Sequence, residues 1–158
     1  MRSARPVNPS LSAAGQDALD QYAGYLRNEE DLSLSTVRNY LSDLRHFAAW
    51  CEATWEEGQE AEQPFAPSGV STPTITRYRS YLQTVLQLKP SSINRSLVTL
   101  KRYFSWAVET GLVVRNPATV VKLVAQESQP PRHLTDTEEE ALIAAVTASG
   151  NLRDRTII

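Results

Sequence analysis

The sequence is poor in the residues that build covalent cross-links and metal sites. One cysteine, Cys51, stands among 158 residues, so a disulfide within the chain is excluded. Cys51 falls on the apolar side of an expected helix, which favours a buried structural thiol over a nucleophile. The two histidines, His46 and His133, lie far apart in the chain, and we therefore expect no metal site.

Long apolar runs and common catalytic motifs are also missing. No stretch approaches ~18 consecutive apolar residues, so we expect no membrane span. The first ten residues, MRSARPVNPS, contain no apolar core of the kind that a secretory signal needs. The chain has no phosphate-binding loop and no GxSxG or HExxH motif, and we expect no cofactor.

The net charge of −2 hides a strong asymmetry along the chain. Residues 1–62 carry five basic and eleven acidic residues, a net charge of −6. Residues 63–126 carry eight basic residues and one acid, Glu109, a net charge of +7, whereas residues 127–158 return to −3. A basic block between acidic ends indicates a polyanionic partner, although the helices of purely structural proteins also segregate charge.

Apolar residues recur at the helical period along most of the chain, which predicts an all-α fold. Helices are expected over about 12–28, 33–53 and 72–88, from Pro90 to a stop at Gly111, over 135–147, in a short piece over 119–124, and again from near Leu152. The expected capping residues are Ser33 or Ser35, Thr72, Ser91 and Ser92, and Thr135. The pattern is interrupted at Ile158, so we expect a piece of a longer protein.

Composition divides the chain into four parts. Residues 1–11 indicate a disordered tail, and residues 12–124 a helical domain. Residues 125–133, AQESQPPRH, are polar with two consecutive prolines and indicate a linker to a further segment, residues 134–158. Inside the helical domain, residues 54–71 hold four glutamates, two prolines and two glycines, which predicts a long loop.

The helix that begins at Pro90 has two contrasting faces. Its apolar face consists of Ile93, Leu97, Leu100, Phe104, Ala107 and Val108. The opposite face carries two arginines and three hydroxyls and no acid, at Ser91, Ser92, Arg95, Thr99 and Arg102. Such groups suit contacts with phosphates and base edges in a DNA major groove. The alternative is the solvated face of an ordinary bundle helix.

The helix over 33–53 has a similar division. Its core side is formed by Val37, Leu41, Leu44, Ala48 and Cys51, widened by Tyr40 and Phe47. Its polar side carries Ser35, Arg38, Asn39, Ser42 and His46, with Arg45 at the edge. This side is either a second DNA-facing surface or a solvated face on which Asp43 and Arg45 pair with charged residues nearby.

Three segments together resemble one protein family. The pattern SSINRxLxxLKRYFxWA from Ser91, followed by Gly111 and Asn116-Pro117-Ala118, resembles the last main helix of the core-binding domain of tyrosine recombinases (phage integrases, Xer- and Cre-like proteins). Residues 32–51 resemble the second helix of that domain. Leu134-Thr135, Glu138-Glu139 and residues 152–155 resemble the opening of the family's catalytic domain.

The resemblance implies both a fold and a function. The implied fold is a SAM-like, four- to five-helix orthogonal bundle with a short C-terminal helical extension. The implied partner is double-stranded DNA at a recombination site, with self-association on DNA through the first helix, in the cytoplasm. The implied DNA-binding residues are Ser35, Thr36, Arg38, Asn39, Ser42, Arg45, Ser91, Ser92, Arg95, Thr99 and Arg102.

The resemblance places the chemistry outside this chain. In the family a tyrosine nucleophile cuts the strand, and the first activating arginine follows the stretch that matches residues 152–158. None of the six tyrosines here matches that nucleophile, so we expect no catalytic residue in this chain and a tyrosine recombinase in the full-length protein.

Two other functions fit a helical bundle. One is a protein-interaction module that does not bind DNA. The other is a helix-turn-helix regulator, which is disfavoured because a loop and a whole helix separate the two candidate faces. Salt dependence distinguishes the first alternative, since binding to phosphates weakens steeply as salt rises.

Overall fold

The computed structural model describes residues 8–28, 31–56, 63–126, 131–150, 153 and 156. Within these residues the chain is helical and contains no strand, which confirms the all-α prediction. The elements in order are α1 (Ala13–Asn28), α2 (Leu34–Glu56), the short 3-10 helix η1 (Pro67–Gly69), α3 (Thr72–Thr84), α4 (Pro90–Glu109) and α5 (Asp136–Ser149). None of the described helices has an apolar stretch that could cross a membrane.

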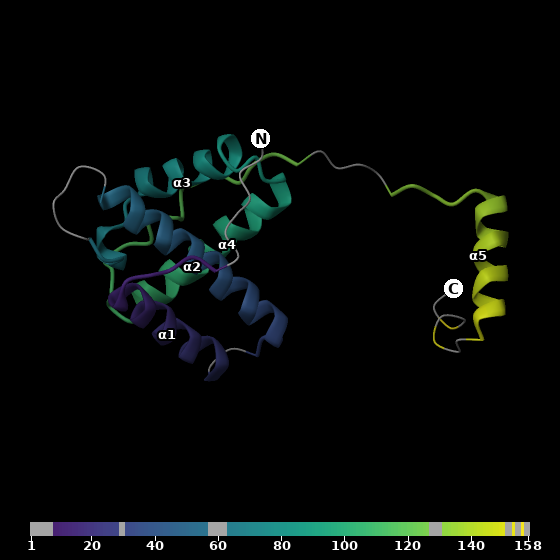
Figure 1. Ribbon diagram of the computed structural model, residues 1–158, viewed down its shortest axis with the longest axis horizontal. Coiled ribbons are helices and arrows are strands. Elements are labelled where there is room, and N and C mark those ends of the chain that lie inside the picture. The colour runs from purple at the N-terminus through teal and green to yellow at the C-terminus, as the bar shows by residue number, and fades with distance from the viewer. Residues whose placement is uncertain are drawn as a thin grey trace. The chain divides into compact units, whose positions relative to one another are not determined.

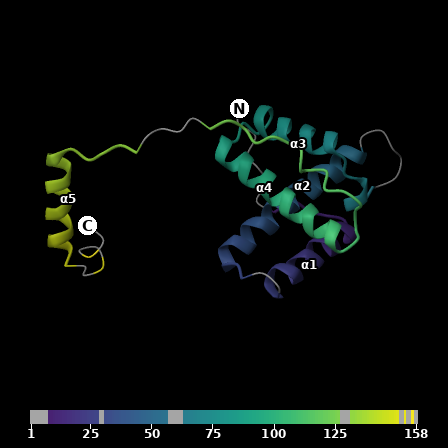
Figure 2. The ribbon, with the colours of Figure 1, turned by 180° about the vertical axis from the view of Figure 1, so that it is seen from behind.

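The chain separates into two compact units, Met1–Gln126 and Glu127–Ile158. The first unit contains α1 to α4 (Figure 1). Helix α2 contacts both α1 and α4, and α4 also contacts α3. Figures 1 and 2 show α2 and α4 crossing at the centre of this unit, from the front and from behind. This crossing decides which side chains of the two helices remain exposed.

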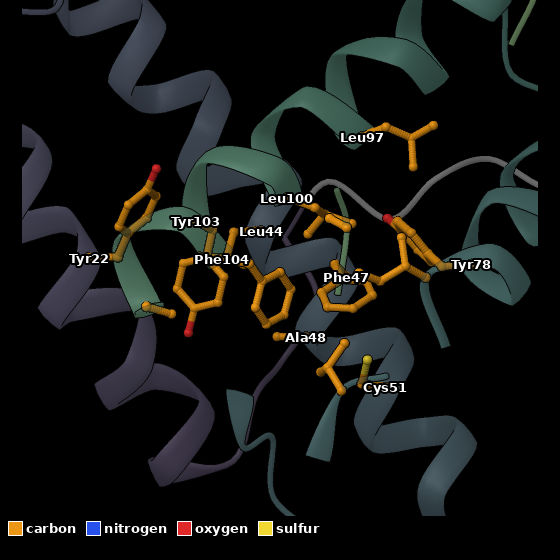
Figure 3. Close-up of a cluster of buried hydrophobic side chains, with 14 of the residues drawn as sticks. Tyr22, Leu44, Phe47, Ala48, Cys51, Tyr78, Leu97, Leu100, Tyr103 and Phe104 are labelled. Carbon is orange, nitrogen blue, oxygen red and sulfur yellow. The ribbon is translucent and has the colours of Figure 1, made fainter. Parts of the chain in front are cut away.

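Aromatic side chains fill the space between the helices. Phe47 of α2 packs edge-on against Tyr78 of α3, with ring centroids 5.0 Å apart, and against Phe104 of α4, at 6.4 Å. Tyr22 of α1 meets Tyr103 of α4 edge-on at 5.1 Å. Figure 3 shows these rings together, with Leu44 and Leu100 beside them. All four helices of the first unit thus contribute to one core.

The predicted apolar faces largely form that core. Ile93, Leu97, Leu100, Phe104 and Ala107 of α4 are buried, as are Val37, Leu44, Phe47, Ala48 and Cys51 of α2. Burial raises the pKa of the Cys51 thiol far above its ordinary value, and Glu52 adds to this effect, which agrees with an inert structural cysteine. Val108 is an exception on α4, because its side chain is exposed.

Several helix ends differ from the predicted ones. Helix α3 stops at Thr84 rather than near Leu88, because Gln87 takes a left-handed conformation with φ 49° and the Leu88 N–H returns to the Leu82 carbonyl. As a result the Val85 side chain is exposed. Helix α2 continues three residues beyond the predicted end, to Glu56.

The predicted stop at Gly111 is confirmed. Gly111 has a φ of 76°, the Leu112 N–H bonds to the Ala107 carbonyl at 2.8 Å, and the Gly111 N–H bonds to the Val108 carbonyl at 3.1 Å. These paired bonds form a Schellman motif, which needs a left-handed residue at this position. Glycine adopts that conformation without a steric penalty.

Some capping predictions are wrong. Ser71, not Thr72, caps α3, and forms a capping box with Thr74. Lys89 is the N-cap of α4 and makes no side-chain cap bond, so Ser91 and Ser92 lie inside the first turn. In the second unit, Thr135 caps α5 as expected, with Glu138 completing a capping box.

The segment that follows α4 differs from the prediction. Residues 119–124 form no helix; residues 117–120 form a turn. Val124 is instead fixed by Asn94 of α4, whose amide donates to the Val124 carbonyl at 2.9 Å and whose carbonyl accepts the Val124 N–H at 2.7 Å.

The expected tail and loop are also partly packed. Leu11 of the tail packs against the core, and Phe65 and Val70 of the loop are buried. Glu52 of α2 joins the two segments, because its carboxylate accepts bonds from Ser12 and from the Phe65 N–H. Residues 1–7 of the tail, 57–62 of the loop and most of the helix expected near Leu152 lie outside the described residues.

Candidate nucleic-acid interface

The polar face of α2 is exposed at most of the predicted positions. Ser35, Arg38, Asn39 and Ser42 are exposed, as the helical period predicts. Thr36 is half-buried and is engaged at the start of the helix, where its N–H donates to Ser33 Oγ at 3.2 Å. Ser33 therefore acts as an N-cap of α2, and the helix presents one arginine, one amide and two hydroxyls to solvent.

Arg45, at the edge of that face, is directed toward α1. Its Nη2 donates to Gln16 Oε1 at 2.7 Å, and its side chain is half-buried. The bond braces α1 against α2. Arg45 retains further N–H donors for an outside acceptor, because a guanidinium carries five of them.

The polar face of α4 is narrower than predicted. Ser91 and Arg95 are exposed, and Ser92 is half-buried. Arg102 is half-buried and lies over the ring of Tyr40 of α2, 5.4 Å from its centroid, in cation–π geometry. Tyr40 thereby supports an arginine from a neighbouring helix, a role that sequence reasoning missed.

The position predicted for Thr99 is wrong. Its side chain is 0% exposed, because α2 crosses α4 over this side of the helix. Thr99 Oγ1 instead donates to Asp43 Oδ2 at 3.4 Å. Thr99 is therefore a residue of the helix crossing and not of the exposed face, and we do not retain it as a direct DNA contact.

Asp43 of α2 and Arg95 of α4 form a bidentate salt bridge where the two helices cross. Arg95 Nε donates to Asp43 Oδ2 at 2.9 Å, and Arg95 Nη2 donates to Oδ1 at 3.1 Å. Asp43 is 1% exposed, whereas the Arg95 side chain is 48% exposed. The hydrogen bond to Asp43 raises the pKa of Arg95 while partial burial opposes the rise, and the guanidinium stays charged.

Sequence reasoning placed Arg95 but missed its partner. Asp43 was considered only as a residue answering charges nearby. Two features of the sequence pointed to such a pair. Asp43 is an acid on a helix whose neighbouring polar residues are basic or neutral, and the helix that begins at Pro90 has a polar face with arginines and no acid. Sequence alone did not show which arginine would meet it.

The exposed charge of the two faces is positive. The acids of α2 before Glu56 are Asp43 and Glu52, and both are buried. Helix α4 has a single acid, Glu109, at its last residue. In the described part of the chain no group of acidic, histidine or cysteine side chains could hold a metal ion. The two crossing helices therefore present hydroxyl, amide and guanidinium groups, which can bind a ligand through hydrogen bonds.

Comparison with known proteins identifies the family. Residues 19–111 match the model of the phage integrase N-terminal SAM-like domain. The chain is 32% identical over 136 residues to the tyrosine recombinase XerC of Pelobacter propionicus, which covers 85% of this chain and 42% of that protein. It is 28% identical over 160 aligned positions to the tyrosine recombinase XerD of Ralstonia nicotianae, covering 100% and 48%.

A further relative extends the same pattern. The tyrosine recombinase XerC of Mycobacterium sp. (strain KMS) is 30% identical over 148 residues, covering 90% of this chain and 46% of that protein. The chain thus spans less than half the length of these relatives. No solved structure gives a significant match. Because the domain model matches more than half of the chain and these relatives are tyrosine recombinases, the chain belongs to the phage integrase family of tyrosine recombinases.

Proposed function

We propose that the first unit binds double-stranded DNA at a recombination site through the polar faces of α2 and α4. The observation that carries the proposal is the pairing of exposed basic and hydroxyl groups on two crossing helices whose own acids are buried or terminal. Phosphates attract such a surface, and its amide and guanidinium groups suit base edges.

The two faces divide into two kinds of contact. Base contacts come from the N-terminal halves of the helices, through Arg38, Asn39 and Ser42 on α2 and Ser91, Ser92 and Arg95 on α4. Arg45 and Arg102, each already held by one neighbouring side chain, contact phosphates at the edges. Ser35 and Thr36, at the start of α2, add hydroxyl donors to the same surface.

In the full-length protein this unit would hold the DNA for a tyrosine recombinase. Residues 12–124 would form the core-binding domain, residues 125–133 the linker and residues 134–158 the start of the catalytic domain. The catalytic domain would cut and rejoin the strands from the opposite side of the duplex. Helix α1 would join neighbouring protomers on the DNA. The family membership supports each of these assignments.

A salt titration of duplex binding tests the proposal. For a surface that neutralises several phosphates, the logarithm of the association constant falls linearly with the logarithm of the salt concentration, with a slope of about −0.9 per phosphate. Arg38→Ala should make the slope shallower by about one unit if Arg38 meets a phosphate, or relax the sequence preference if it meets a base.

The control variant is Arg77→Ala, since Arg77 is exposed on α3 and belongs to neither face. It should leave both the affinity and the slope unchanged. Absence of any duplex binding at low salt would contradict the proposal and favour a protein-interaction module.

A further inference from the structure

Asp43 is a charged side chain enclosed at the point where α2 and α4 cross. Both of its oxygens accept bonds from Arg95, and Thr99 adds a third donor. Burying a carboxylate costs free energy unless it is paired, and an apolar pair of similar size often stabilises such a crossing as well or better. The pair therefore has features that stability alone does not require.

The burial of the pair is one-sided. Asp43 is 1% exposed, but the Arg95 side chain is 48% exposed. Asp43 engages the Nε atom and one N–H of Nη2. A guanidinium has five N–H donors in a rigid plane, so three remain on Nη2 and Nη1. Two of these, one on each Nη atom, suit two-point bonding to the O6 and N7 atoms of a guanine or to a phosphate.

We propose that Asp43 is a positioning residue for sequence reading, which holds the plane of Arg95 so that its free Nη edge meets one base pair. This inference rests on the proposed DNA-binding function and deepens it. Asp43 does not touch DNA. It removes rotamer freedom from Arg95 before binding, and it balances the charge of Arg95, so that the pair attracts phosphates of every sequence only weakly.

The two effects of Asp43 act in opposite directions on two kinds of DNA. Loss of the carboxylate frees the guanidinium plane, which weakens binding to the correct sequence. The same loss leaves one more uncompensated positive charge, which strengthens binding to any other sequence. A residue with only a structural role would instead weaken binding to both kinds of DNA together.

The test uses the full chain and two DNA probes. One probe is the duplex that the unchanged chain enriches from a random library, and the other is a shuffled duplex of the same composition. The main variant is Asp43→Asn, which keeps the shape and removes the charge. The control is Ser96→Ala, because Ser96 neighbours Arg95, is also buried and has a hydroxyl without a hydrogen-bond partner.

We expect D43N to lower the ratio of specific to shuffled affinity about tenfold, within the range of one two-point base contact. The affinity for the shuffled duplex should hold or rise, with a salt slope steeper by up to about one unit. Scanning each base pair of the enriched duplex should show the lost preference at one or two adjacent positions. S96A should change neither the ratio nor the pattern.

Arg95→Lys provides an independent variant, since lysine keeps the charge but lacks the planar fork. It should lose preference at the same base pairs as D43N. If D43N unfolds below the temperature of the binding assay, Arg95→Lys alone tests the inference. An unchanged ratio in both folded variants, or losses at different base pairs, would overturn the inference while leaving DNA binding intact. A chain that enriches no duplex would overturn this inference and the proposed function together.

Discussion

Two carboxylates of α2, Asp43 and Glu52, are both buried, and they are satisfied in different ways. Asp43 is bonded by a half-exposed arginine of another helix. Glu52 accepts bonds from neutral donors, namely the Ser12 N–H at 3.0 Å, the Ser12 hydroxyl at 2.5 Å and the Phe65 N–H at 2.8 Å. The first carboxylate lies beneath the candidate DNA surface, and the second fastens two connecting segments to the end of the helix.

The difference shows that burial of a charged side chain does not by itself mark a functional site. What distinguishes the two carboxylates is the group bonded to each and how far that group is exposed to solvent. Glu52 accepts bonds from two backbone N–H groups and from the Ser12 hydroxyl, all of them neutral and at least part-buried, and we assign it a purely structural role. Asp43 binds a guanidinium that retains free donors on an exposed edge. Removing each carboxylate should therefore affect different properties.

The largest effect is expected for Glu52→Ala. The substitution leaves three donors without their acceptor and opens a small cavity, so we expect a loss of about 3–5 kcal/mol in the free energy of unfolding. Chemical denaturation followed by circular dichroism measures it. The specific to shuffled DNA ratio should not change while the chain is folded. Glu109→Ala, at an exposed acid, should cost under about 0.5 kcal/mol.

Arg95→Ala should have the next largest effect. The substitution leaves Asp43 buried without its cation, so it should lower stability as well as remove a candidate DNA contact. We expect a loss of about 2–3 kcal/mol of stability, below the ~3–5 typical of a fully buried pair because half of Arg95 is exposed.

The same denaturation experiment measures the effect of R95A, with Arg38→Ala as its matched control. Arg38 is an exposed arginine on α2, so its removal should change stability by less than about 0.5 kcal/mol. Equal stability of R95A and R38A would show that the buried carboxylate does not depend on its partner.

A smaller effect is expected for Gly15→Ala. A Cβ atom at this position would lie 2.6 Å from Glu52 Oε1, and the carboxylate cannot swing away without losing its bonds to Ser12 and Phe65. We expect a loss of about 1–3 kcal/mol from this overpacking. Gly24→Ala is the matched control in the same helix, because nothing lies within 4 Å of its added Cβ. It should be neutral or stabilising by up to about 1 kcal/mol.

The smallest effect concerns a half-exposed carboxylate, Glu138 in the capping box of α5. The Thr135 N–H, then Arg132 and the Thr135 hydroxyl, lower the pKa of Glu138 below its ordinary value of 4.5. A lowered pKa means that the cap is fully present above pH 4.5 and is lost as the pH falls through the folded-state pKa. The protection of the first-turn amides of α5, measured as amide exchange relative to the intrinsic rate at each pH, should fall over that acid range. Glu138→Gln should remove this step.

The sequence predicted the helices and most of the core because both depend on local periodicity. The positions of Ile93, Leu97, Leu100 and Phe104 on one face of α4 were enough to identify that face. The predicted width of the face was wrong, since Ser96, Thr99, Tyr103 and Trp106 are buried as well. A helical wheel assumes one covering neighbour, whereas α4 is contacted by both α2 and α3.

The candidate site was predictable to a similar degree. The exposed positions Ser35, Arg38, Asn39, Ser42, Ser91 and Arg95 follow from the helical period alone. The bonds of Arg45 to Gln16, Arg95 to Asp43 and Arg102 to Tyr40 do not, because each joins two helices whose crossing is set by the packing of the whole core. The DNA-binding roles of these residues stay predictions.

The bonds of Asn94 to Val124 have a mechanical consequence. Asn94 holds the backbone of Val124 by two hydrogen bonds, and the next residue of α4, Arg95, holds Asp43. A force that pulls on the chain beyond Val124 therefore acts first on the second turn of α4, and not on the C-terminal end of that helix. The turn that carries Arg95 is thus the point at which the chain leaving the bundle is attached to it.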